Sequence, residues 1–99
     1  MGMSIEMSMQ VILKDKYMVP EIKDMLNKKY GMKIDDEFDK ENEVELFCVL
    51  NGVVPYDYID ELKKDLRKYK GIKVDASVWY LERDPDEVFE IDDDEEEGE

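Results

Sequence analysis

The chain of 99 residues contains no histidine, and its only cysteine is Cys48. Without histidine, neither a Ser-His-Asp nor a Cys-His catalytic arrangement can be built, and no imidazole is available as a metal ligand. One cysteine cannot form an internal disulfide, nor can it supply a zinc or iron–sulfur site within one chain. These absences exclude the most familiar catalytic arrangements, so we expect a protein that is not an enzyme.

Glycine and long apolar runs are also scarce. The five glycines, at positions 2, 31, 52, 71 and 98, are isolated from one another, so no phosphate-binding loop is visible. The longest apolar run, Leu46–Leu50, is far too short to cross a membrane. Residues 1–10 have neither a cationic start nor a long apolar stretch, which predicts no signal peptide. We therefore expect a cytoplasmic protein without membrane contact.

Charge is abundant but unevenly distributed. Charged residues make up 42% of the chain, and the formal net charge is −14. Residues 1–85 hold 18 acidic and 14 basic residues, whereas residues 86–99 hold ten acidic residues and no basic one. An acidic protein repels phosphate, so nucleic acid is an unfavourable partner. Abundant lysine and glutamate with little asparagine or glutamine is typical of proteins from heat-adapted sources.

One phrase of the sequence occurs almost twice. Residues 28–35 read KKYGMKID, and residues 67–75 read RKYKGIKVD with one additional lysine. The similarity continues past the glycine into the next apolar segment. This favours a duplicated structural unit over a shared preference of helix ends for Lys, Tyr and Gly. We therefore predict a single domain, residues 1–91, with pseudo-repeats at 4–38 and 44–82.

Each repeat is expected to contain one amphipathic helix. Apolar residues recur at helical spacing after Pro20 and again after Pro55. Both prolines follow a valine and suit the first turn of a helix, where the missing N–H has no partner to lose. Lysine-rich ends followed by Gly31 and Gly71 suit the last turn.

A strand is predicted on either side of each helix. Apolar and polar residues alternate in 4–13 and in 44–51, as they do in a strand with one covered face. The segments 32–35 and 72–81 follow the helices and alternate in the same way. The resulting order is β-α-β-β-α-β, with the polar residues 39–43 as the central turn.

Two β-α-β units with right-handed crossovers interleave into a four-stranded antiparallel sheet of order 4-1-3-2, with both helices on one face. This α+β arrangement is the ferredoxin-like two-layer sandwich. One unit alone cannot bury its apolar face, which explains the repetition. The fold does not by itself determine a function.

The segment EVFEI at 87–91 is predicted to form a fifth strand on the outer edge of the fourth. A turn over residues 83–86 would place Ile91 opposite Val78 and protect a long apolar edge. Complete disorder of residues 86–99 is the first alternative.

Addition of residues 87–91 to the sheet of a partner is the second alternative. Residues 92–99 have nothing to bury and are expected to form a solvated, disordered acidic tail.

The side of the sheet without helices is expected to carry several large apolar side chains among polar ones. Aromatic residues ringed by polar groups are typical of protein interfaces. The expected interface residues are Ile12, Phe47, Val49, Trp79, Leu81 and, with the fifth strand, Val88. The sequence therefore favours a non-catalytic interaction module, either a homodimer or a subunit of a complex. A surface shielded by its charged neighbours is the alternative.

A run of carboxylates around the central turn offers a second function. Oxygen ligands of this kind bind Ca²⁺ or Mg²⁺. The candidate metal ligands are Asp35, Asp36, Glu37, Asp39, Glu41 and Glu43. The spacing is not that of an EF-hand loop, because no glycine permits the sharp central bend. A solvated acidic hairpin is the simpler interpretation.

RNA-recognition domains share this strand order and stack bases on aromatic residues of the sheet. Phe47 lies on the corresponding third strand, but the segment around it lacks the basic and glycine residues of that signature. The basic residues of the second helix, at positions 63–70, are mostly explained by the helix dipole. They could also attract the acidic tail.

Overall fold

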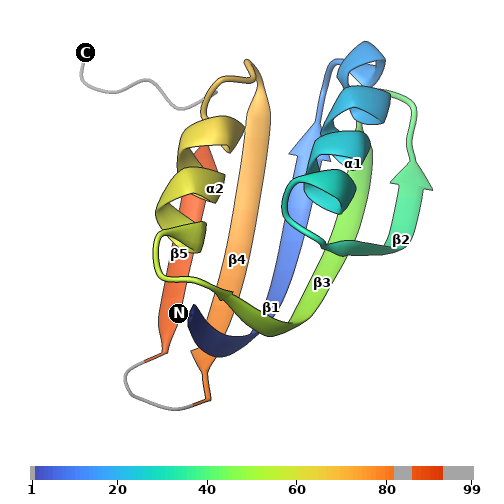
Figure 1. Cartoon of the computed structure of the whole chain (residues 1–99). Helices are drawn as coiled ribbons and strands as arrows, with labels where there is room; N and C mark the ends of the chain where they lie inside the picture. Colours follow the sequence, from blue (N-terminus) through green and yellow to red (C-terminus); the bar gives the residue numbers. More distant parts are fainter. Residues whose placement is uncertain (1, 82–85, 93–99) are drawn as a thin grey trace.

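The computed structural model describes residues 2–81 and 86–92, which form an antiparallel sheet covered by two α-helices. In chain order the elements are β1 (Gly2–Leu13), the short 3-10 helix η1 (Lys16–Met18), α1 (Val19–Lys28), β2 (Lys33–Asp39), β3 (Val44–Pro55), α2 (Tyr58–Leu66), β4 (Ile72–Tyr80) and β5 (Glu87–Asp92). Figure 1 shows both α-helices in front of the sheet, on the same face. Within the described ranges, neither helix is long and apolar enough to cross a membrane.

The sheet has five strands in the order β2-β3-β1-β4-β5, and β1 is its central strand. All four neighbouring pairs are antiparallel. The predicted α+β class, with an antiparallel sheet and two helices, is therefore confirmed. The observed order differs from the four-stranded 4-1-3-2 layout that the sequence predicted, because β5 pairs along the outer side of β4.

The hydrophobic core lies between the helices and the sheet. On β1 the alternate residues Ile5, Val11 and Leu13 are completely buried, whereas Glu6 and Ser8 between them are exposed. Burial of each large aliphatic side chain contributes about 1.5–3 kcal/mol relative to exposure. A slip of β1 by one residue would turn this whole set to solvent, so the alternation fixes which face the helices cover.

The two copies of the repeated phrase end their helices in the same way. Gly31 has φ of +66° and Gly71 has φ of +72°, a left-handed conformation that glycine adopts without strain. After α1, the N–H of Gly31 donates to the carbonyl of Asn27, and the N–H of Met32 donates to that of Leu26. These bonds satisfy carbonyls that the helix leaves unpaired. The chain then turns back into the sheet with Met32 and Ile72 completely buried.

The tyrosines of the two copies connect the repeats reciprocally. The hydroxyl of Tyr30, at the end of α1, donates to Asp65 of α2 at 2.5 Å. The hydroxyl of Tyr69, after α2, donates to Glu21 of α1 at 3.2 Å. Each repeat therefore donates a hydrogen bond to a carboxylate on the helix of the other, and the two helices are held side by side.

Two element boundaries differ from the prediction. Pro55 is the last residue of β3, and α2 begins three residues later at Tyr58. The strand extends this far because β1 pairs with β3 over its whole length, from Gly2 opposite Pro55 to Leu13 opposite Val44.

The predicted strand 32–35 is also too short. The structure has β2 from Lys33 to Asp39, with a β-bulge between Ile34 and Asp36. The added residues extend the pairing with β3 as far as Asp39 opposite Val44, and the N–H of Lys40 then donates to the carbonyl of Glu43 in the predicted central turn.

The fifth strand is present, so residues 87–91 pair within the chain rather than with a partner or not at all. The predicted register is wrong by four residues, because Val78 faces Glu87 instead of Ile91. The predicted register would place Glu87 opposite another glutamate. In the observed one, its carboxylate accepts from the hydroxyl of Tyr80 at 2.6 Å and from Lys63 of α2 at 3.0 Å. A shift of four preserves the face, so Phe89 and Ile91 are buried as expected.

The turn predicted over residues 83–86 and the acidic tail predicted from residue 92 lie, except for Asp86 and Asp92, outside the described residues. Asp92 itself ends β5, opposite Lys73 of β4.

Candidate interaction surface

The face of the sheet away from the helices, called the open face below, is built by the alternate residues of all five strands. Because β1 pairs with both β3 and β4, the registers define rows across this face. One row runs from Trp79 through Glu6 to Asn51. All six residues predicted for an interface lie on the open face or directly beyond it, and none is buried.

The aromatic residue Trp79 lies at one end of this face. Its side chain is 42% exposed, and Leu81 beyond it is 55% exposed. The N–H of Leu81 donates to the carbonyl of Ser4 at 3.0 Å, which holds this end of the chain against β1. Val53, at the corresponding end of β3, is 72% exposed. An aromatic ring and two aliphatic side chains therefore remain in contact with water at this end.

A second apolar group lies toward β2. The rings of Phe38 and Phe47 meet edge to face, with centroids 5.7 Å apart. Such a pair contributes about 0.5–1.5 kcal/mol beyond its buried area. Phe38 is nevertheless 48% exposed, because β2 is the outermost strand. Ile12 lies two residues from the partner of Phe47 along β1 and is half-buried.

Between the two groups the open face is hollowed. A depression of about 570 Å³ is lined by Trp79 and Val49, together with the polar residues Glu6, Asn51 and Lys33. Val88 lies at the far side of the face, opposite Ser77, and is 71% exposed. The polar residues of β1 lie between the apolar groups. The exposed apolar residues therefore form separate groups and not one continuous patch.

Phe38 and Val53 belong to this surface, although sequence reasoning did not select them. The bulge shifts the alternation of β2 by one residue and so brings Phe38 to the side of Phe47. Nothing in the acidic run around Phe38 signals a bulge. Val53 was missed because the predicted strand ended at residue 51. The alternation that places Phe47 and Val49 on the open face continues through Asn51 to Val53 in the longer strand.

The carboxylates predicted to bind a metal are dispersed along β2 and its turn. Glu37 pairs with Lys23 of α1 at 2.6 Å, and Asp39 pairs with Lys16 at 2.8 Å. Asp36 lies opposite Phe47, on the open face. Within residues 2–81 and 86–92, no three His, Cys, Asp or Glu side chains are placed to hold a metal ion. The predicted ligands are therefore not brought together here.

The buried carboxylate Asp65 forms the most highly connected polar cluster that sequence reasoning missed. It accepts from Lys29 at 2.7 Å and from Tyr30, and it pairs with Lys68 at 3.2 Å. Hydrogen bonds from Lys29 and Tyr30 hold the pKa of Asp65 well below its usual value of 3.8. Burial and the bond to Asp65 raise the pKa of Tyr30. The cluster joins the end of α1 to α2.

Cys48 lies on the core side of β3 and is almost completely buried. Burial raises the pKa of its thiol to about 12. Because the thiolate is the reactive form, a thiol in this environment is a poor nucleophile.

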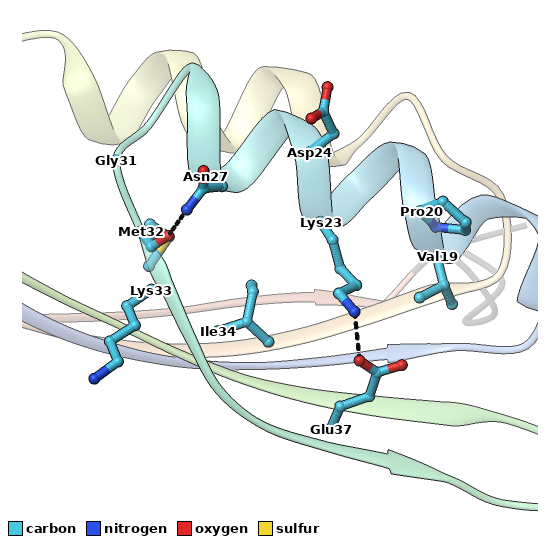
Figure 2. Close-up of a pocket in the computed structure, with 10 residues that line it drawn as sticks. All are labelled: Val19, Pro20, Lys23, Asp24, Asn27, Gly31, Met32, Lys33, Ile34 and Glu37. Carbon is cyan, nitrogen blue, oxygen red and sulfur yellow. Dashed lines mark hydrogen bonds and ion pairs between the residues drawn. The ribbon is translucent and has the colours of Figure 1, made fainter.

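A groove separates α1 from β2 (Figure 2). It has a volume of about 790 Å³, and its apolar lining includes Val19 and Pro20 at one end and Met32 and Ile34 at the other. Figure 2 shows Lys23 reaching from the helix to Glu37 on the strand, so that this ion pair crosses the groove.

None of the protein-family models, curated proteins or solved structures compared with this chain matches it.

Proposed function

We propose that this protein is a non-catalytic interaction module, which binds a protein surface through its open face. The observation that carries the proposal is the exposure of Trp79, Leu81 and Val53 on a sheet face without helices. Soluble monomers seldom leave several large apolar residues exposed on neighbouring strands, and such groups are typical of contact sites.

The composition of the open face fits a protein partner. Tryptophan and phenylalanine are enriched among the residues that dominate binding energy, and they are usually surrounded by a polar rim. Here Glu6, Ser8 and Gln10 of β1 supply polar groups between the aromatic ones. A nucleic acid would meet more carboxylates than lysines on the same face, because among its described residues only Lys33 and Lys73 are basic.

The scaffold for this function is, we infer, ferredoxin-like over residues 2–80. The run β4-β1-β3-β2 within the sheet has the corresponding order, and both helices cover one side. In such a two-layer arrangement the two described helices leave the second face of the sheet uncovered. A partner is the natural cover for its apolar residues.

The absence of catalysis is part of the proposal. The chain has no histidine, its thiol is buried, and its buried carboxylate Asp65 is held by three neighbours. Histidine is therefore missing, and the buried thiol and the buried carboxylate are not free to act as a nucleophile or a base.

The first prediction concerns Trp79→Lys, which places a charge at the centre of the exposed apolar group. We expect wild-type protein to associate, as a homodimer or with a partner from native lysate, and the variant to lose at least about tenfold in affinity, as for an interface hot spot. Sedimentation velocity measures the homodimer, and affinity capture from lysate measures the complex. Circular dichroism and thermal unfolding should remain unchanged, because the side chain is not part of the core.

Tyr17→Lys is the matched control, since Tyr17 is 94% exposed in η1, away from the open face. This aromatic-to-lysine change should leave association intact. A strictly monomeric wild-type protein would exclude the homodimer. Capture of the same partner at the same yield by Trp79→Lys would exclude the open face as the binding site.

A further inference from the structure

The strand β2 is one of the two outer strands of the sheet. Its inner side pairs with β3, from Lys33 opposite Val49 to Asp39 opposite Val44. Along the described part of the chain, no strand pairs with its outer side. The N–H and C=O groups directed outward from such an edge can form hydrogen bonds with an added extended chain.

The two edges of the sheet differ on the side that faces the helices. At β5, Lys63 of α2 lies over the ring of Phe89 at 4.9 Å and binds Glu87, so helix and strand are in direct contact. At β2, the groove of about 790 Å³ separates the strand from α1 (Figure 2). An added chain beside β2 could place alternate side chains in this groove, against Val19 and Ile34.

The charge of β2 limits what can occupy this edge. The strand contains four carboxylates and one lysine. Glu37 and Asp39 have ion-pair partners in Lys23 and Lys16, whereas Asp35 and Asp36 have none among the described residues. Both of these carboxylates are exposed. The edge therefore presents uncompensated negative charge to an incoming chain.

A second copy of this protein is a poor occupant. Antiparallel pairing of two β2 strands, centred on Asp36, would place Asp35 and Glu37 opposite each other and Asp36 opposite its own copy. Like charges directly opposite each other destabilise a strand pair. A basic chain would instead place lysine or arginine opposite these carboxylates.

We propose that the β2 edge and the α1–β2 groove bind an extended protein segment in which basic and apolar residues alternate. The segment adds to β2 as a sixth strand. Its apolar side chains enter the groove beside Val19 and Ile34, and its basic side chains pair with Asp35 and Asp36. The main chain supplies affinity, and the two sets of side chains supply specificity.

The ion pair between Lys23 and Glu37 lies across the path of the segment. Both side chains are more than one third exposed, so opening the pair costs at most about 1 kcal/mol. The groove therefore opens without disturbing the core.

The second prediction tests this proposal with a blocked seven-residue peptide of alternating lysine and valine, titrated into the full ¹⁵N-labelled chain at low salt. We expect amide shifts concentrated in residues 33–39 and 19–27, together with slower amide exchange along β2. Two control peptides distinguish the effect of charge on binding from the effect of alternation. One alternates glutamate and valine, and the other has four lysines followed by three valines, which preserves charge and composition but not alternation.

Paired variants complete the test. Asp35→Lys with Asp36→Lys should weaken binding about tenfold, because two attractive cross-strand pairs become repulsive. Asp57→Lys with Asp60→Lys changes the net charge equally at the start of α2, where both residues are exposed, and should alter the affinity less than about twofold.

Equal binding of any control peptide at β2 would overturn the proposal. So would full affinity in the Asp35 and Asp36 variant, or the absence of localised shifts at millimolar peptide. The site lies at the β2 edge, whereas Trp79 lies on β4, so this test is separate from that of Trp79→Lys.

Discussion

At the scale of single residues, Asp65 is the side chain on which the most contacts depend. Its carboxylate is nearly buried, yet it is charged, because Lys29, Tyr30 and Lys68 all approach it. The hydrogen bond from Tyr30 to Asp65 is also one of the two reciprocal tyrosine–carboxylate bonds that join the repeats; the other runs from Tyr69 to Glu21. A buried charge with complete partners fixes the relative position of two helices, whereas loss of one partner leaves the others without compensation.

The third prediction follows from the charge of Asp65. Asp65→Asn should lower the free energy of unfolding by about 2 kcal/mol at pH 7, because the ion pairs are lost while the shape is kept. The folded-state pKa of Asp65 is depressed below 3.8. Its stabilising contribution is therefore fully present above about pH 5 and is lost as the pH falls below 4. Urea unfolding at pH 7 and pH 3 should show the difference between wild type and variant decreasing toward acid.

Asp60→Asn is the control, since Asp60 lies exposed on the same helix. It should change stability by less than about 0.5 kcal/mol at both pH values. A destabilisation by Asp65→Asn that is independent of pH would mean that the carboxylate acts through packing rather than through its charge.

At the scale of elements, each repeat depends on a helix end that returns the chain to the sheet. Gly31 and Gly71 both adopt positive φ, although the residues around them are not identical. A side chain at Gly31 would have open space, since no heavy atom lies within 4 Å of the position of its Cβ. The requirement for glycine is therefore conformational and not steric.

The fourth prediction is that Gly31→Ala lowers the free energy of unfolding by about 1 kcal/mol, the cost of an L-residue in the left-handed region. Gly52→Ala is the matched control, because Gly52 also has open space but lacks positive φ. That change should be neutral or stabilising, because alanine restricts the unfolded chain. Equal destabilisation by both substitutions in urea titrations would show that the positive φ of Gly31 is not the cause of the loss.

The elements also show how far sequence reasoning reaches. Alternation of apolar residues predicted the strands and their buried face, because the period of two is read directly from residues such as Ile5 and Val11. It could not predict the bulge that turns Phe38 to the open face, since a bulge adds a residue without a composition signal. The register of β5 was wrong because the loop length was assumed, and the pairing of Glu87 with Tyr80 and Lys63 depends on tertiary positions.

At the scale of the whole molecule, one core supports all five strands and both helices. Cys48 lies within this core on β3, next to the central strand, opposite Met9. Its thiol can meet a reagent only if the sheet and its helical cover separate. The cysteine is therefore a probe for the opening of the whole domain rather than of one edge.

The fifth prediction uses this position. At pH 8 a thiol-specific reagent such as DTNB should label native protein very slowly, because Cys48 is buried and its pKa is raised to about 12. Low concentrations of urea should increase the labelling rate in proportion to the population of unfolded chain. Gly31→Ala should increase it about fivefold under the same conditions, as expected for a loss of about 1 kcal/mol.

Asp60→Cys provides the reference for an accessible thiol, because Asp60 lies exposed on α2, away from the open face. It should add one rapidly labelled thiol and leave the slow one unchanged. If Cys48 is labelled quickly and independently of urea, β3 must open without global unfolding. The sheet would then not unfold as a single cooperative unit, because a local opening of β3 would be enough to expose Cys48 to the reagent.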